Sequence, residues 1–110
     1  MKMRMAVLLV ARVDDQYAGY CALDTDPYQK YNAAYISMLY VRPKRRGVGV
    51  GGALVDSAVS VVRDLSIPAI ELLVHSSEGM DAVARHLYLR KGFERKQRTQ
   101  GLGELMIRKI

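Results

Sequence analysis

The sequence has no tryptophan, one cysteine and one phenylalanine among its 110 residues. A single cysteine cannot form an internal disulfide, which excludes the disulfide-stapled domains of small secreted proteins. Long apolar runs are missing too, because the longest, Met5 to Val10, is far shorter than the roughly 18 residues that span a bilayer. The positive residues at the start precede neither a long apolar stretch nor a cleavage site for a signal peptide. A cytoplasmic protein that does not cross a membrane is therefore expected.

The composition is that of an ordinary globular protein, with 50% hydrophobic and 25% charged residues. Typical domains contain roughly 100 to 150 residues, so we expect a single domain over residues 1–110. The net charge of +6 favours anionic partners such as phosphates, nucleic acid or acidic surfaces. The basic residues form two clusters, Lys44 to Arg46 and a C-terminal one expected to be a solvated face. The C-terminal cluster consists of Arg90, Lys91, Arg95, Lys96 and Arg98.

Alternating and apolar segments predict three strands in the first half of the chain. Two strands are predicted over Met3 to Val13 and Tyr17 to Leu23, joined by the polar turn Asp14 to Gln16. Ala33 to Val41 is rich in strand-forming side chains and follows a polar loop. An antiparallel meander results, in which Cys21 is expected to be a buried, inert thiol.

The hydrophobic period then becomes that of an amphipathic helix, which Pro68 ends. The apolar positions on one face of this helix are Val50, Ala53, Leu54, Ala58, Val61, Val62 and Leu65. The apolar run Ala69 to Val74 is typical of a central strand that is covered on both faces. Together with the preceding strand and helix it makes a βαβ unit with parallel strands.

A second helix and a closing hairpin complete the predicted architecture. The helix start has capping hydroxyls and acids at Ser76, Ser77, Glu78 and Asp81, and its buried face is expected to be Val83, Ala84, Leu87 and Tyr88. Gly92 lies where a left-handed C-cap would fall, and Phe93 to Thr99 and Glu104 to Ile110 form the hairpin. The fold class is α/β in the α+β sense. A mixed, mostly antiparallel sheet with two helices is predicted, in the order β-β-β-α-β-α-β-β.

Glycines and arginines are concentrated between Val41 and Leu54, where the predicted third strand gives way to the first helix. Glycine lets backbone amides approach a ligand, and the first turn of a helix leaves N–H groups unpaired at the positive end of its dipole. Arg45 and Arg46 can neutralise phosphate oxygens that the amides do not reach. The segment therefore predicts an anion site.

Three known anion-binding loops are alternatives for this segment. A P-loop is excluded because Ala53 and Leu54, rather than Lys and Ser or Thr, follow Gly52. The dinucleotide fingerprint Gly47-x-Gly49-x-x-Gly52 is present, but antiparallel strands precede it and the acidic Glu71 begins a strand instead of ending one. The segment Arg46-Gly47-Val48-Gly49-Val50-Gly51 fits Arg/Gln-x-x-Gly-x-Gly/Ala, which resembles the coenzyme A loop of the GNAT superfamily of N-acetyltransferases.

A second motif supports this resemblance. Ala84-Arg-His-Leu-Tyr-Leu-Arg-Lys-Gly-Phe93 is similar to the family's downstream helix, Ala-x-x-Leu-Tyr followed three residues later by Gly-Phe. Both motifs occur in the family's order and on the expected types of element. The chain is identified as a short member of this superfamily whose N-terminal elements are missing, because the family usually has a strand and one or two helices before the strand that starts here near Met5.

The resemblance implies acetyl-CoA as donor and direct attack by a primary amine of a small molecule or protein, without an acyl-enzyme. Backbone groups of Leu39, Tyr40 and Val41 would bind the pantetheine arm. The pyrophosphate would be held by Arg46, Gly47, Val48, Gly49, Val50, Gly51 and Gly52. Tyr88 matches the family tyrosine beside the departing sulfur, where a phenol with a pKa of about 10 can act as general acid. Its alternative role is that of a helix tyrosine packed for its ring.

Several points stay open at this level. Candidate general bases are Glu71, His75, Asp24 and Asp26, whereas His86 is expected to face solvent. Two histidines and one cysteine without ligand spacing predict no metal site. The missing elements imply an open acceptor pocket or one completed in a homodimer.

The alternative function is a non-catalytic acyl-CoA-binding module of the same fold. A nucleic-acid-binding domain is not favoured, because no recognised motif or aromatic stacking platform is present.

Overall fold

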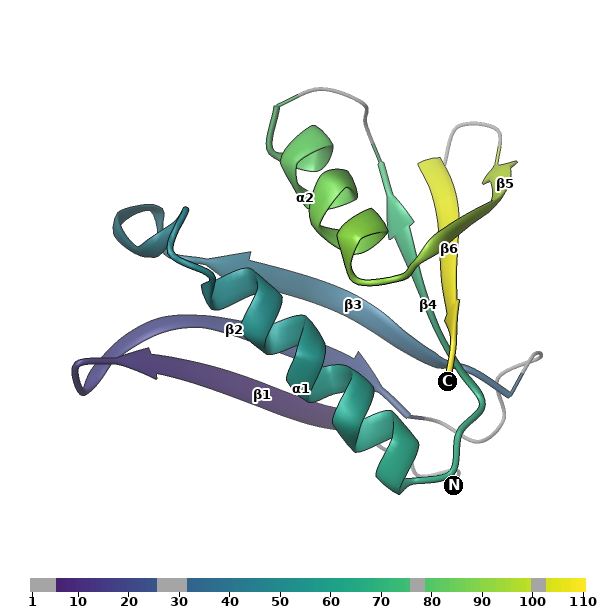
Figure 1. The fold of residues 1–110 in the computed structure, drawn as a ribbon, viewed down its shortest axis with the longest axis horizontal. Coiled ribbons are helices and arrows are strands. Elements are labelled where there is room, and N and C mark those ends of the chain that lie inside the picture. Colours follow the sequence, from purple (N-terminus) through teal and green to yellow (C-terminus); the bar gives the residue numbers. More distant parts are fainter. Residues whose placement is uncertain (1–5, 26–31, 76–78, 100–102) are drawn as a thin grey trace, which may run out of the picture.

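The computed structural model describes residues 6–25, 32–75, 79–99 and 103–110. Within these ranges six strands form one sheet in the order β1-β2-β3-β4-β6-β5, together with two α-helices and a 3-10 helix, η1 (Figure 1). The elements are β1 Ala6–Val13, β2 Gln16–Asp24, β3 Ala34–Val41, η1 Pro43–Arg45, α1 Val50–Asp64, β4 Ala69–Val74, α2 Gly79–Arg90, β5 Glu94–Thr99 and β6 Gly103–Lys109. The predicted order of elements and the mixed sheet are confirmed. Residues 3–5 of the predicted first strand, Asp26 and residues 76–78 lie outside the described residues.

The predicted antiparallel meander is formed by β1, β2 and β3. Asp14 and Asp15 both have left-handed backbone angles, with φ of 53° and 62°, which suits a two-residue hairpin turn. Side chains alternate between two faces of the sheet. We call the face that α1 covers the inner face, where Ala18, Cys21 and Leu23 are buried, and the opposite face the outer face.

Helix α1 buries a stripe that shares Val50, Leu54, Ala58 and Val62 with the predicted one. The buried side chains are Val50, Leu54, Val55, Ala58, Val59 and Val62. Ala53 and Leu65 are exposed, contrary to the prediction, because the buried stripe follows steps of four along the helix and Leu65 lies after its last turn. No helix in the described part of the chain has both the length and the apolarity that a membrane span needs.

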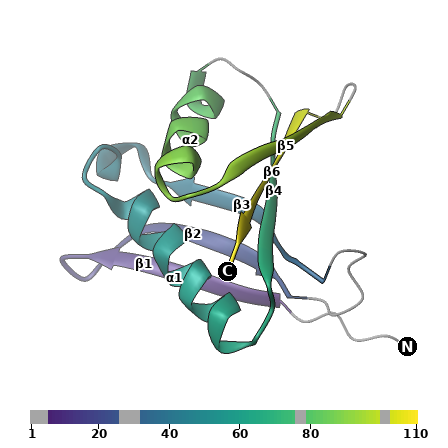
Figure 2. The same ribbon diagram turned by 45° about the vertical axis from the view of Figure 1, so that its right-hand side comes forward.

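Helix α2 lies against the N-terminal end of α1 (Figures 1 and 2). Tyr88 is buried and Ala84 and Leu87 are partly buried, as predicted, but Val83 is exposed, contrary to the prediction. The predicted C-cap is confirmed. Gly92 has a φ of 87°, and the N–H of Phe93 donates to the carbonyl of Tyr88 at 3.0 Å.

The sheet divides between β3 and β4, which are its predicted parallel pair. They pair at only two positions, Ala34 with Ile70 and Tyr35 with Glu71, and then diverge (Figures 1 and 2). Strand β4 continues beside β6 from Ala69 to Val74, and β3 continues beside β2 to Val41. Among the described residues, the edge of β3 from Ile36 to Val41 that faces β4 therefore has no strand partner. We call this division the split, and its paired end the apex.

Candidate functional site

The loop between β3 and α1 forms the candidate site predicted from the glycines. Gly47 and Gly49 have φ angles of 81° and 88°, and a Cβ atom placed on either would meet nothing within 4 Å. The first intrahelical bond of α1 runs from the N–H of Ala53 to the carbonyl of Gly49 at 3.0 Å. The N–H groups of Val50, Gly51 and Gly52 thus precede that bond, and the first turn holds no acidic residue. Open space, free amides and the positive helix end suit an anion.

Three arginines hold this loop in place. Arg42 Nη1 donates to the carbonyl of Tyr17 at 3.1 Å, and Arg45 Nη2 donates to Gln16 Oε1 at 2.7 Å. Arg46 Nε donates to the carbonyl of Val41 at 2.9 Å. Two of the arginines therefore attach the loop to the β1–β2 hairpin, a role that the sequence analysis missed because these contacts join residues far apart in the chain.

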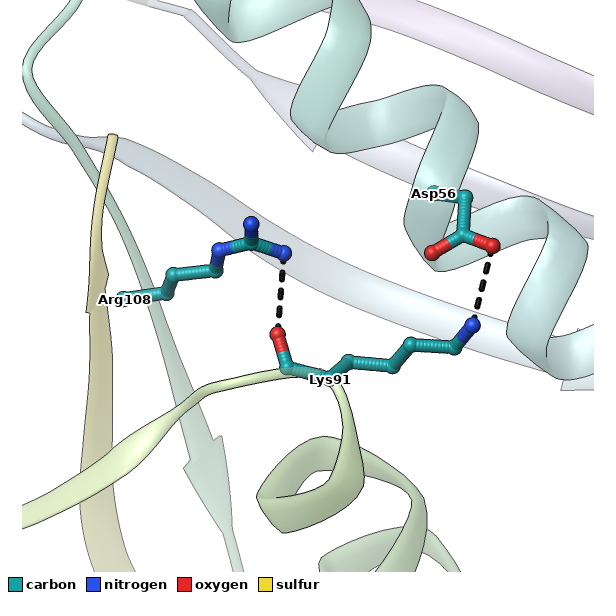
Figure 3. Close-up of polar contacts among 3 residues, drawn as sticks. All are labelled: Asp56, Lys91 and Arg108. Carbon is teal, nitrogen blue, oxygen red and sulfur yellow. Dashed lines mark hydrogen bonds and ion pairs between the residues drawn. The ribbon is translucent and has the colours of Figure 1, made fainter.

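Gly51 and Gly52 have a packing role besides the predicted one. A Cβ atom on Gly51 would lie 3.2 Å from Leu87 Cδ2, and one on Gly52 would lie 3.3 Å from Lys91 Cε. Small residues are needed here because α2 approaches α1 so closely. Lys91 Nζ donates to Asp56 Oδ2 at 2.9 Å, and Arg108 Nη1 donates to the carbonyl of Lys91 at 2.9 Å (Figure 3). The turn after α2 is thereby fixed to α1 and to β6.

The predicted pantetheine-binding residues lie on β3 beside the split. Leu39 and Val41 are partly buried against the core, whereas Tyr40 is on the outer face with its ring 5.8 Å from that of Tyr20. A strand edge without a partner can pair with an extended ligand that carries amide groups. The carbonyl of Val41 already accepts a hydrogen bond from Arg46. The backbone near Leu39 is therefore the part of this edge that is more available to a ligand.

Tyr88, the predicted general acid, is 6% exposed, and its ring centroid lies 5.6 Å from that of Phe93. Burial, followed by the nearby Cys21 and Asp81, raises the pKa of Tyr88 well above its usual value. The phenol is therefore protonated at neutral pH, as a proton donor must be. The same burial and ring contact also fit the alternative packing role. Cys21 is buried as predicted, and burial raises its pKa to about 11, so its thiol is protonated.

The candidate general bases lie in different parts of the structure. His75 is exposed, as is His86, which was expected to face solvent. Asp24 and Glu71 lie in one cross-strand row with Tyr35 between them, because Asp24 pairs with Tyr35 in β2–β3 and Tyr35 pairs with Glu71 in β3–β4. Burial and the charge of Glu71 raise the pKa of Tyr35. In the described part of the chain, no group of His, Cys, Asp and Glu side chains is arranged to hold a metal ion.

A buried acid on β6 was not singled out from the sequence. Glu104 Oε1 lies 3.2 Å from Arg95 Nε and 3.6 Å from Arg85 Nε, so this carboxylate joins α2 and β5 to β6. Arg95 itself is exposed, in agreement with the solvated face predicted for the C-terminal basic cluster. The pairing could not be found from local spacing, because its members come from three separate elements.

Solved proteins share this architecture. PaiA N-acetyltransferase from Thermoplasma acidophilum, in complex with coenzyme A, is 24% identical with a TM-score of 0.80, over 96% of this chain and 61% of that one. A Bacillus anthracis protein assigned as a streptothricin acetyltransferase, in complex with acetyl coenzyme A, is 21% identical with a TM-score of 0.82, over 99% and 64%. PH1933 from Pyrococcus horikoshii is 27% identical with a TM-score of 0.78, over 92% and 63%. The chain thus spans slightly less than two thirds of each of these proteins.

The sequence itself matches a family model over most of its length. Residues 3–93 match the model of the acetyltransferase (GNAT) family, a range that includes both the glycine loop and the Ala84 to Phe93 motif. The two motifs that suggested the resemblance therefore lie inside one continuous match. The chain belongs to the acetyltransferase (GNAT) family.

Proposed function

We propose that this chain, as a single domain over residues 1–110, binds acetyl coenzyme A and transfers the acetyl group to a primary amine of a small molecule or protein. The observation that carries the proposal is the loop before α1. Gly47 and Gly49 adopt left-handed angles beside open space, and no acid balances the positive end of the helix. Neither glycine is required by neighbouring side chains, so the space beside them suits the pyrophosphate of the coenzyme.

The remaining roles follow from the positions of the residues. Amides from Arg46 to Gly52 would hold the pyrophosphate, and the free edge of β3 at Leu39, Tyr40 and Val41 would pair with the pantetheine amides. The amine nitrogen attacks the thioester carbonyl, the carbon–sulfur bond breaks, and the sulfur leaves as a thiolate. Tyr88 would give its phenolic proton to that thiolate, while the amine releases its extra proton to a base or to water.

The test is a thermal melt with coenzyme A. A ligand selective for the native state at a hundredfold excess over its Kd stabilises by about 2.7 kcal/mol, or roughly 10 °C for a domain of this size. ATP at the same concentration is the control for unspecific phosphate binding and should shift the midpoint far less. An unchanged midpoint at millimolar coenzyme A would contradict the proposal. Binding of acetyl-CoA without thiol release from any of a panel of amines would instead identify a non-catalytic acyl-CoA-binding module.

A further inference from the structure

Glu71 is a buried acid, and one of its two carboxylate oxygens has no hydrogen-bond partner among the described residues. Its residue is 8% exposed, and Oε1 has no hydrogen-bond partner in the described part of the chain. Removing a carboxylate from water without a donor is energetically costly, and for this reason buried acids are normally paired. A ligand that brings a donor or a positive charge would satisfy this oxygen.

The position of Glu71 relates it to the proposed transfer site. It belongs to the last pair of residues that joins β3 to β4, so it lies at the apex of the split. Its side chain is on the outer face with Tyr35, because the neighbouring pair Ala34 and Ile70 is in the inner core. A positive group at Glu71 would also meet the ring of Tyr35, which is a suitable cation–π surface.

Glu71 is too far from the proposed leaving group to act on the reacting nitrogen itself. Tyr88 lies near Cys21, which contributes to its raised pKa, and Cys21 pairs with Leu39 of β3. Between Tyr35 and Leu39 a strand advances about 13 Å at 3.3 Å per residue. Tyr88 is also in the inner core, on the opposite face of the sheet from Glu71. A general base must reach its proton directly or through one water, so the carboxylate is placed for a different group of the acceptor.

We propose that Glu71 anchors a second, non-reacting ammonium group of the acceptor, which makes the acceptor an aliphatic diamine or polyamine. This inference rests on the proposed acetyltransferase function. One amino group reaches the thioester beside the split while the other is bound at the apex between Glu71 and Tyr35.

The test compares two acceptors that differ only in the second charge, 1,8-diaminooctane and 8-amino-1-octanol, in a thiol-release assay with saturating acetyl-CoA. The wild type should have a KM about tenfold lower for the diamine. Glu71→Gln should raise the KM for the diamine to that for the amino alcohol and leave both kcat values within a factor of two. Asp14→Asn, which removes an exposed charge in the turn between β1 and β2, at the far end of β2 from the row that contains Glu71, is the matched control and should keep the preference.

Direct binding gives a second measurement that does not depend on turnover. Titration of 1,8-diaminooctane into the coenzyme A complex should release heat with the wild type and Asp14→Asn, but not with Glu71→Gln. If coenzyme A does not bind, the proposed function fails, and the same titration into the free protein still tests the anchor. A preserved preference in Glu71→Gln would overturn the inference. So would an equal loss of kcat for both acceptors, which would place Glu71 in the chemistry, or a fall in melting temperature, which would make its role structural.

Discussion

At the scale of single residues, the glycines of the loop before α1 fall into two groups with different physical reasons. Gly51 and Gly52 lie beside the side chains of Leu87 on α2 and of Lys91 just after it, so a larger residue would have to displace them. Gly49 has no such neighbour, but its φ of 88° is unfavourable for residues with a Cβ atom. A left-handed backbone next to open space leaves room for a ligand at Gly49.

Gly49→Asp should therefore abolish coenzyme binding, because it places a negative charge where the pyrophosphate is proposed to lie. The matched control is Gly49→Ala, which has the same backbone strain without the charge. Both variants should lose about 1 to 2 kcal/mol of stability from the left-handed angle. Only the aspartate variant should lose the thermal shift with coenzyme A. Equal shifts in the two variants would contradict the placement of the pyrophosphate.

Tyr88→Phe should separate the two roles that its position allows. The phenylalanine keeps the ring beside Phe93 but removes the transferable proton, so thiol release at saturating acetyl-CoA should fall by about 10² to 10⁴ while coenzyme affinity is unchanged. The raised pKa of Tyr88 fixes the sign of the pH effect. Because the pKa lies above the usual tyrosine value of about 10, Tyr88 keeps its proton throughout the neutral range. The wild-type rate, measured from about pH 6 to about pH 9, should therefore show no loss that is due to Tyr88. A mutant with more than about half the wild-type rate would assign Tyr88 to core packing.

At the scale of elements, the contact between α1 and α2 connects the proposed phosphate loop with the helix that carries Tyr88. Gly51→Leu should push Leu87 and separate the helices, because overpacking of this kind costs typically 1 to 3 kcal/mol. Ala53→Leu, at an exposed position of the same helix, is the control and should have little effect. Urea unfolding measures both.

A double mutant tests the cause of that loss. Leu87→Ala vacates the volume that the new leucine needs, so Gly51→Leu with Leu87→Ala should be less destabilised than the sum of the two single variants. Additive losses would show that the two side chains do not meet. The same melts with coenzyme A would report whether the helix contact also positions the loop.

The elements themselves could be predicted from the sequence, whereas the contacts between them could not. The change from alternating residues to the helical period at Val50, the proline after α1 and the glycine at position 92 are local signals, and the structure follows them. The tether from Arg45 to Gln16 and the row from Asp24 through Tyr35 to Glu71 depend on strand register, which no local spacing encodes. Glu71 was named as one possible base, but its burial and its unpaired oxygen appear only when β3 and β4 are brought together.

At the scale of the whole molecule, one edge of the sheet presents apolar side chains to solvent. Strand β1 pairs with β2 only, so its other side is an open edge in the described part of the chain. On the outer face Leu8 is 64% exposed and Val10 is 52% exposed. The strand register places Met38 and Tyr40 of β3 in the same cross-strand rows as these two residues. Open edges and exposed apolar rows are the usual features of a surface that pairs with another strand.

We predict that a second copy of this chain covers that edge, so that the protein is a homodimer in solution. Two identical edges can pair antiparallel about a two-fold axis, which places the exposed apolar rows of both copies next to each other on one continuous sheet. Light scattering at tens of micromolar protein should give twice the chain mass of 12.3 kDa. Val10→Lys places a charge in the row and should yield the monomer, whereas Ser60→Lys on the exposed face of α1 should not. A wild-type mass of one chain would contradict the dimer. It would also mean that a single chain must bind the acceptor at the apex, where Glu71 and Tyr35 both come from the same sheet and need no partner.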